Sequence, residues 1–116
     1  MIKYSLTDNT KEFAGRTLYQ IKAEKSFGSV KKGDLGGYIE KEDNLSQADN
    51  AWVYGNALVY GNALVYGDAW VFDNAKVYGD AWIYGNAWIF DNAWVFDNAK
   101  VYGDAKVYDN ARVCGM

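Results

Sequence analysis

Residues 56–80 read NALVYGNALVYGDAWVFDNAKVYGD and repeat one six-residue phrase four times. Each phrase consists of Ala, a variable residue, Val, Tyr or Phe, and a turn pair in which Gly or Asp precedes Asn or Asp. The same phrase, with minor substitutions, fills the chain from Ala51 to Met116 without an insertion, which makes eleven repeats. Two degenerate repeats, 39–44 and 45–50, precede them in the same phase.

The alternation inside each repeat predicts a short β-strand. Successive side chains of a strand point to opposite faces, so Ala and Val share one face while the variable residue and the aromatic share the other. Gly, Asn and Asp tolerate the positive φ that a sharp corner often requires. Such strands could form a meander of hairpins or the sides of a parallel β-helix. The meander is disfavoured, because tight hairpins prefer Asn-Gly to Gly-Asn and a single sheet would leave the Ala/Val face uncovered.

A β-helix with three repeats per coil predicts extra similarity between residues 18 positions apart. The positions that agree are Trp52, Trp70 and Trp88, then Phe72 and Phe90, and then Asp73, Asp91 and Asp109. Trp82 and Trp94 belong to other sides of the coil. We therefore predict an all-β fold, a triangular parallel β-helix over residues 39–116. Its 13 repeats make 13/3, or about four, coils of 18 residues each.

The repeats VYGNAL, VFDNAK and IYGNAW follow the pattern Val-x-x-x-Ala-x. In this pattern residues 51–116 resemble the hexapeptide-repeat proteins that fold as left-handed parallel β-helices, and residues 39–50 resemble them weakly. The aromatic after Val departs from the enzymes of that group, which usually carry a small or acidic residue there. The wording V-Y-G-[N/D]-A, preceded by GRTLYQIKA and KKGDLGGYIEKEDNLS, resembles short uncharacterised bacterial and bacteriophage proteins. Left-handed winding is what the resemblance implies, since periodicity alone does not fix the hand.

Residues 1–38 lack the repeat and are expected to form a small β cap on the first coil. Alternation over residues 2–6 predicts one strand, and residues 16–27 predict a second. Turns are expected between them, at residues 8–9 and 14–15. A segment this short rarely folds unaided, and the open edge of a terminal coil needs cover.

The cap also needs an apolar interior, and we expect Leu35, Ile39 and Leu45 to provide it. The glycine-rich stretch GDLGG, residues 33–37, could be mistaken for a phosphate-binding loop. It lacks the strand-loop-helix context and the Lys-Ser/Thr ending of such a loop, so a tight turn is expected instead.

The composition excludes several classes of function. The net charge is −3, from 12 basic and 15 acidic residues, which argues against binding nucleic acid phosphates. The single cysteine, Cys114, rules out an internal disulfide and suits a reducing compartment. No apolar run reaches membrane-spanning length and no signal-peptide core is present, so we expect a cytoplasmic protein without membrane contact.

The outward-facing residues of one side carry the main functional hypothesis. These residues, which we predict to form an interaction surface, are Trp52, Trp70, Trp88, Tyr54, Phe72, Phe90 and Tyr108. So many aromatics on one flat side would exceed the apolar patch that a soluble monomer usually exposes. The interpretations left open are a second copy, a foreign protein, cover by residues 1–38, and carbohydrate or unstacked bases. Self-association into a dimer or trimer is favoured among them.

A second hypothetical contact lies in the last coil. Lys100, Lys106 and Arg112 occupy the variable position of the last three repeats and would ring that coil with positive charge. Together with Val113 and Cys114 they form a candidate C-terminal end contact, a rival to the aromatic side. Cys114 stands where other repeats have Tyr or Phe, so packing is a more natural role for it than nucleophilic chemistry.

Enzymatic function is disfavoured by what the chain lacks. The resemblance raises hexapeptide-repeat acyltransferases and gamma-class carbonic anhydrases, but their chemistry requires His and this chain has none. Stacked Asp73, Asp91 and Asp109 could attract Ca²⁺, although Asp also suits a turn, and no metal or cofactor is predicted. We expect a non-enzymatic β-helical scaffold that binds protein. The alternatives are a phage-encoded inhibitor or decoy of a host defence protein, and an acyltransferase-like enzyme without the usual His.

Overall fold

The computed structural model describes residues 2–115 and confirms the predicted all-β solenoid of about four coils. Three longer strands, β1 (Tyr4–Phe13), β2 (Arg16–Ala23) and β3 (Leu35–Ile39), precede one turn of 3-10 helix, η1 (Glu42–Asn44). Short strands then follow at six-residue intervals. They are β4 (Trp52–Val53), β5 (Leu58–Val59), β6 (Leu64–Val65), β7 (Trp70–Val71), β8 (Lys76–Val77), β9 (Trp82–Ile83), β10 (Trp88–Ile89), β11 (Trp94–Phe96), β12 (Lys100–Val101), β13 (Lys106–Val107) and β14 (Arg112–Cys114).

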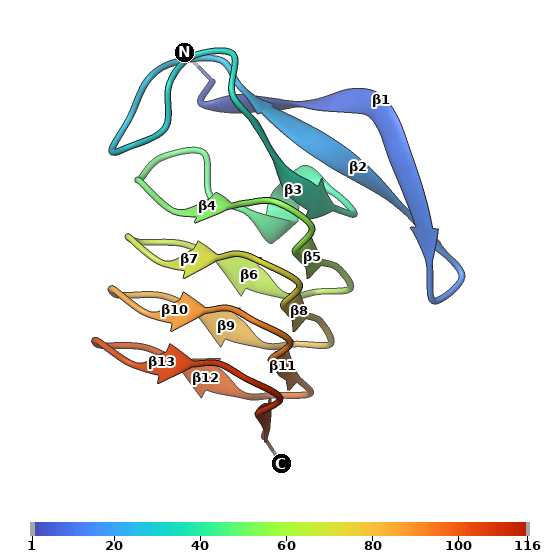
Figure 1. Cartoon of the computed structure of the whole chain (residues 1–116), viewed down its shortest axis with the longest axis vertical. Coiled ribbons are helices and arrows are strands. Elements are labelled where there is room, and N and C mark those ends of the chain that lie inside the picture. The colour runs from blue at the N-terminus through green and yellow to red at the C-terminus, as the bar shows by residue number, and fades with distance from the viewer. Residues whose placement is uncertain (1, 116) are drawn as a thin grey trace.

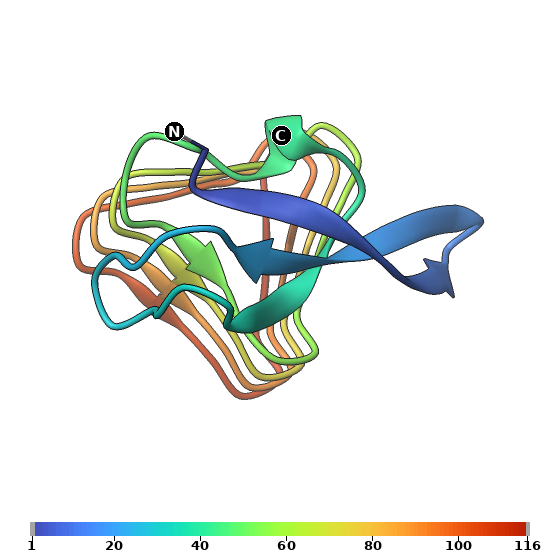
Figure 2. The ribbon, with the colours of Figure 1, turned by 90° about the horizontal axis from the view of Figure 1, so that it is seen from above.

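The short strands stack into the three sides of a prism, and each pairs in parallel with the strand three repeats away. One side consists of β4, β7, β10 and β13, the second of β6, β9 and β12, and the third of β5, β8, β11 and β14. The third sheet continues upward through β3, β2 and β1 (Figure 1). Seen from the N-terminal end, the chain turns anticlockwise as it recedes, so the coil is left-handed (Figure 2).

The interior of the prism is a column of small and branched apolar side chains. Every Ala from Ala51 to Ala99 and every inward-facing Val or Ile from Val53 to Val107 is buried. Burying one Val or Ile contributes roughly 1.5–3 kcal/mol before the entropy of ordering the chain is subtracted. Because each coil covers the next, neighbouring coils share this burial.

The corners depend on residues that accept a left-handed backbone conformation. The first residue of the turn pair has a φ between 57° and 69° at ten corners, six of them Gly and four of them Asp, within residues 2–115. Asp tolerates this conformation better than most residues, because its short side chain hydrogen-bonds locally. The alternation of Gly and Asp in the sequence therefore reflects a single backbone requirement.

The cap begins with a hairpin of β1 and β2. Its turn is at Ala14 and Gly15, both with positive φ, as a two-residue hairpin requires. The turn expected at residues 8–9 is wrong, because β1 runs through them. The pairing shifts instead between Leu6 and Thr10, a bulge that absorbs the extra residues.

Strand β3 approaches the first coil too closely for a side chain at Gly36 or Gly37. A Cβ on Gly36 would lie 2.5 Å from the carbonyl oxygen of Val53, and one on Gly37 would lie 2.7 Å from that of Ala57. The stretch 33–37 is therefore a turn at Gly33 followed by the start of β3, in which positions 36 and 37 require Gly. Leu35 does not fill the cap interior as expected, because its side chain faces solvent with 58% of its surface exposed.

The first coil is longer than the others. Ile39 pairs with Val59 and Leu45 pairs with Val65, each two positions further apart than the paired residues of the later coils, and both are buried at the Val level of the interior. The phase of the degenerate repeats placed these two residues at the Ala level, and that interpretation is wrong. The extra residues lie between Leu45 and Ala51, where Gln47 uses its side-chain amide to hydrogen-bond the backbone of residues 3 and 4. The inserted residues thus provide the surface on which the start of the cap packs.

Candidate functional site

The side formed by β4, β7, β10 and β13, here called the aromatic side, carries two outward ladders. The first is Trp52, Trp70, Trp88 and Lys106, and the second is Tyr54, Phe72, Phe90 and Tyr108. Trp70 and Trp88 stack with ring centroids 5.3 Å apart and planes 2° apart, and Phe72 and Phe90 stack at 4.9 Å. Phe90 and Tyr108 continue the second ladder at 5.4 Å. Aromatic rings are therefore stacked from coil to coil along this side.

Trp52 does not belong to the exposed part of this side, contrary to the sequence prediction. Its side chain is only 1% exposed, because Tyr4 and Phe27 of the cap pack edge-on against its ring at 6.1 Å and 5.3 Å. The strand pattern shows that Trp52 faces outward, but it cannot show that residues far away in the sequence cover it. The cap thus covers one of the seven residues that were predicted to form the interaction surface.

Lys3 fastens the cap beside Trp52. Its Nζ donates hydrogen bonds to the carbonyl oxygens of Asp49, at 2.9 Å, and Ala51, at 2.7 Å, and lies 5.0 Å from the centre of the Phe27 ring. The side chain has no exposed surface. Burial disfavours the charged ammonium and lowers the pKa of Lys3 to about 8, although the Asp49 carboxylate opposes this shift. The cap is therefore attached through a buried ionisable group.

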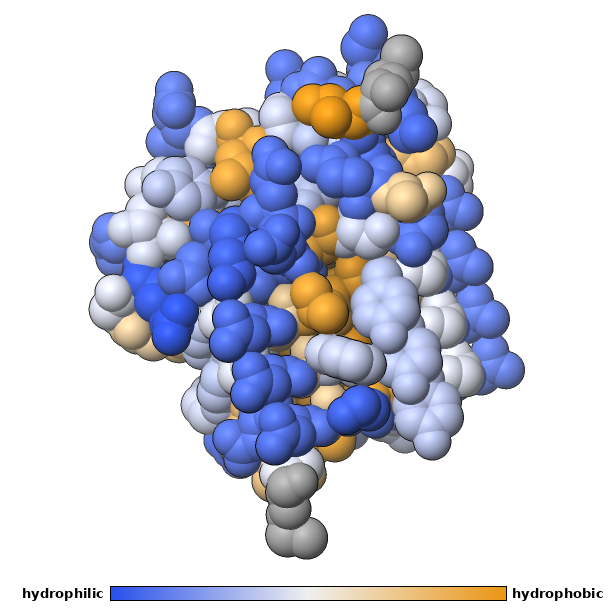
Figure 3. All heavy atoms as spheres, turned by 180° about the vertical axis from the view of Figure 1, so that it is seen from behind, coloured by the Kyte–Doolittle hydropathy of each residue, from blue (hydrophilic) through white to orange (hydrophobic). Residues whose placement is uncertain are grey.

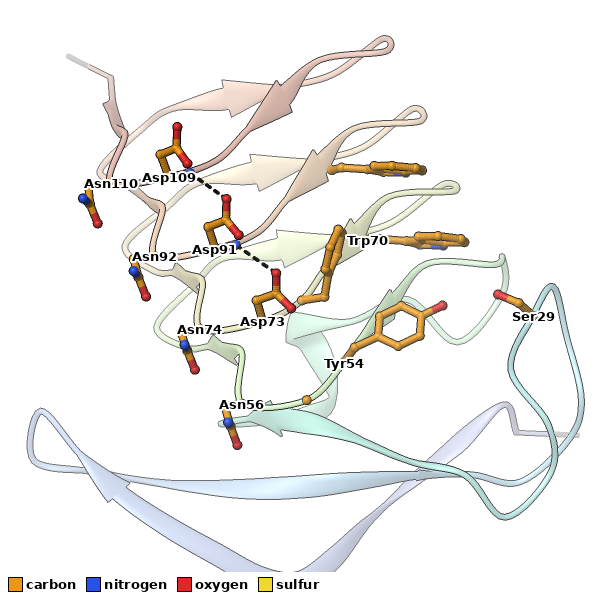
Figure 4. A pocket seen from close by; sticks show the side chains of 13 residues that line it. Ser29, Tyr54, Asn56, Trp70, Asp73, Asn74, Asp91, Asn92, Asp109 and Asn110 are labelled. Carbon is orange, nitrogen blue, oxygen red and sulfur yellow. Dashed lines mark hydrogen bonds between the residues drawn. The ribbon is translucent and has the colours of Figure 1, made fainter.

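Below the cap, the aromatic side is hollowed into an open groove of about 1200 Å³. Its lining runs from Ser29 in the cap loop over Tyr54, Trp70 and Phe72, and ends at the corner that follows this side (Figure 4). That corner presents two columns of polar residues. They are Asp73, Asp91 and Asp109, and, further out, Asn56, Asn74, Asn92 and Asn110. Apolar ring surface and carboxylates therefore meet in one groove.

The three aspartates of this corner form a hydrogen-bonded column. An Oδ2 of Asp73 accepts the backbone N–H of Asp91 at 3.3 Å, and an Oδ2 of Asp91 accepts that of Asp109 at 3.1 Å. All three have a φ of 57–59°. These contacts and the positive φ explain why Asp occupies this turn position. The contacts use only one carboxylate oxygen of Asp73 and one of Asp91. Within residues 2–115, no group of three His, Cys, Asp or Glu side chains is placed to hold a metal ion.

The opposite edge of the aromatic side is also acidic. A smaller hollow of about 430 Å³ lies there, between the cap loop at Phe27 and the turn residues Asp68 and Asp104. Among its described lining residues, the one basic side chain is Lys106. The two hollows share Trp70 and Trp88, so a single aromatic floor is bordered by carboxylates along both edges.

On every side of the prism a Trp ring pairs with the cation three repeats later, and these contacts were not predicted from the sequence. Lys100 lies 5.0 Å above the Trp82 ring, Lys106 lies 4.9 Å from Trp88, and Arg112 lies 4.7 Å from Trp94. The signal was available, because each cation takes the position of its Trp three repeats later. The cations predicted to encircle the last coil therefore each lie on the face of a Trp indole, on three different sides of the prism. In the same coil Val113 is half-buried and Cys114 is exposed, aligned with Phe96 of the coil above.

Over the described residues, the other two sides of the prism are not hollowed into a groove as large as that of the aromatic side. On the side of β6, β9 and β12, three tyrosines form a stacked ladder, and Trp82 is 39% exposed. Viewed from behind, most of the surface is hydrophilic, with hydrophobic residues confined to small areas (Figure 3). On the third side Phe13 of the hairpin covers Tyr60, and this burial raises the pKa of Tyr60 to about 12. The aromatic side is thus where aromatic rings and a large hollow coincide.

Comparison with known proteins supports the fold. Residues 51–67 and 59–71 match the family model described as the YdcK Beta solenoid repeat. No curated protein matches the chain. The match and the structure agree that this is a β-solenoid protein. Among residues 2–115, none lies in a helix long and apolar enough to cross a membrane.

Proposed function

We propose that this chain is a non-enzymatic β-helical scaffold that works by binding protein through its aromatic side. The observation that supports the proposal is the groove of about 1200 Å³ on that side. Its floor is made of rings that stack from coil to coil, so little side-chain entropy is lost when a partner covers them. Aromatic residues in a concave site are also the residues that dominate protein interfaces.

A partner other than a second copy suits this surface best. If two copies met through their aromatic sides with their prisms parallel or antiparallel, the acidic edges of one would face the acidic edges of the other. Among the described lining residues of the two hollows, five are aspartates, set against the single cation of Lys106: Asp68, Asp73, Asp91, Asp104 and Asp109. Juxtaposed like charges oppose association, so self-association through this side is disfavoured. Resemblance to short bacterial and bacteriophage proteins with V-Y-G-[N/D]-A repeats is compatible with a role in binding a foreign protein.

The absence of His from the whole sequence supports a non-enzymatic role. Neither the general base of the acyltransferases nor the zinc ligands of the carbonic anhydrases that the repeats resemble have a counterpart in this chain. Among the described residues that line the groove, the hydroxyl groups belong to Ser29 and Tyr54. Burial raises the pKa of the Tyr54 hydroxyl, which disfavours its ionised, nucleophilic form.

Selection of a displayed random heptapeptide library on the immobilised chain tests the proposal. Peptides are expected to be enriched, to compete with one another, and to lose binding to the variant Trp70→Lys/Trp88→Lys. The matched control is Trp82→Lys, which places a charge on the β9 side and should retain binding. The far-ultraviolet circular dichroism of each variant establishes that the prism is intact. Absence of enrichment, or equal loss in the control, would contradict the proposal.

Oligomeric state gives an independent measurement. Sedimentation velocity at tens of micromolar is expected to give the mass of one chain, 13.0 kDa. A dimer that dissociates in the Trp70→Lys/Trp88→Lys variant would instead make a second copy the partner of the aromatic side.

A further inference from the structure

Resting on the proposed function, we infer that the partner segment of the groove is a short, extended, basic peptide with two Arg or Lys residues three positions apart. The charge of the groove is the first step. Its described lining includes Asp73, Asp91 and Asp109 together with four aromatic residues and no basic residue. The nearest cation of the aromatic side, Lys106, lies on the Trp88 ring and lines the other hollow. The carboxylates of the groove therefore lack a counter-charge within its described lining.

The chemistry of the lining is the second step. Arg and Lys combine a long apolar stem with a charged end, and such side chains lie along apolar surface while the charge meets a polar group. The rings of Trp70 and Phe72 provide the apolar surface, and the aspartate column lies beside them (Figure 4). Asp73 and Asp91 each use one carboxylate oxygen in the backbone contact to the next coil. The other oxygen can accept a charge-assisted hydrogen bond from a guanidinium or ammonium group.

The geometry of the column sets the spacing. Successive coils of a parallel β-structure are about 4.8 Å apart, so Asp73 and Asp109, two coils apart, are separated by about 10 Å along the prism. A peptide in the extended polyproline II conformation advances about 3.1 Å per residue with three residues per turn, so one turn covers nearly the same distance and returns side chains i and i+3 to the same face. A peptide that runs along the column therefore presents residues i and i+3 to Asp73 and Asp109. A neutral oligosaccharide could use the rings, but it would leave three carboxylates without a counter-ion.

The test is fluorescence anisotropy at low salt with fluorescein-labelled Gly-Ser-Arg-Ala-Ala-Arg-Ser-Gly. Its control, Gly-Ser-Ala-Arg-Arg-Ala-Ser-Gly, has the same composition and charge but adjacent arginines. We expect saturable binding of the first peptide, and binding at least threefold weaker for the second. Screening the carboxylates with 0.3 M NaCl should weaken the first peptide several-fold.

Two charge-matched variants locate the binding. Asp73→Asn/Asp109→Asn removes two charges from the groove, whereas Asp80→Asn/Asp97→Asn removes two from another corner, where Asp97 has the same positive φ. Asn tolerates this φ and can still accept the backbone N–H, so both variants are expected to fold. The groove variant should bind the peptide about tenfold more weakly, and the control less than twofold. If the groove variant fails to fold, Asp109→Asn alone replaces it, with a loss of about threefold.

Several results would overturn the inference. Equal weakening by the two variants would mean general attraction to an acidic protein, and equal binding of the two peptides would remove the three-residue spacing. Absence of saturation up to 1 mM peptide would remove the basic partner, as would tighter binding of chitotetraose. If the displayed library nevertheless yields uncharged peptides that depend on Trp70 and Trp88, the proposed function stands while this inference fails.

Discussion

Trp52 and Trp88 occupy the same position of the same ladder, two coils apart, but their surroundings differ. Trp52 is sealed between Tyr4 and Phe27 of the cap, whereas Trp88 lies half-buried between Trp70 and Lys106 at the surface. The repeat sequence is nearly the same in both places. A residue repeated in a solenoid is therefore structural where the cap covers it and remains open to a partner where the cap ends.

The largest expected effect on stability comes from removing the indole of each of these two residues in turn. Trp52→Ala should lower the free energy of unfolding by about 3–5 kcal/mol, because it leaves a cavity under the cap. Trp88→Ala should cost only about 1 kcal/mol, the value of a lost ring stack. Urea denaturation followed by circular dichroism measures both. Equal losses in the two variants would mean that the covered and open coils depend on their indoles alike.

The second prediction concerns the charge buried beside Trp52. The folded-state pKa of Lys3 is about 8, below its ordinary value of 10.5, so between these values the unfolded chain binds more protons than the folded chain. Stability therefore rises with pH in this window. Compared with Lys3→Met, the free energy of unfolding of the natural chain should gain about 2 kcal/mol between pH 7.5 and 9.5.

The same measurement needs a control for tyrosine ionisation. Burial raises the pKa of Tyr4 and Tyr60, so their contribution to stability is present below pH 10 and is lost as the pH rises further. Both chains share these tyrosines, and the difference between the two chains isolates Lys3. Parallel curves for the two chains would show that water reaches Lys3 and that the cap does not seal the first coil.

The prism could be predicted from the sequence because its cause is local. Each repeat contains its own strand, its own corner and its own inward pair. The period of one repeat and the added similarity of every third repeat therefore determine the sides, the ladders and the aspartate column. The cap could not be predicted to the same depth. Its contacts join parts of the chain that are far apart in sequence, as in the hydrogen bonds of Lys3 with Asp49 and Ala51. No repeat in the sequence indicates these contacts.

In the candidate site, likewise, the features that arise from the repeats could be predicted and those that depend on the cap could not. Trp70, Trp88, Phe72, Phe90 and Tyr108 were predicted on the aromatic side and are found there. The groove was not predicted, because its upper wall is the cap loop at Ser29. The insertion near Gln47 was also hidden, since the turn pair at Asp49-Asn50 restores the phase of the repeats.

The smallest expected effect concerns the open coils, where exposed pairs replace the cap. The Lys100 ammonium lies 5.0 Å from the Trp82 ring, with both residues at the surface, so a double-mutant cycle of Trp82→Leu and Lys100→Gln should give a coupling of about 0.5–1 kcal/mol. The control cycle pairs Trp82→Leu with Lys106→Gln, whose side chains lie on different sides of the prism, and should give no coupling. Because an attraction between a cation and a ring survives only if water does not replace it, a coupling below about 0.2 kcal/mol would show that Lys100 is solvated. Lys100 would then not cover the Trp82 ring, and that indole would be available to a partner on the β9 side.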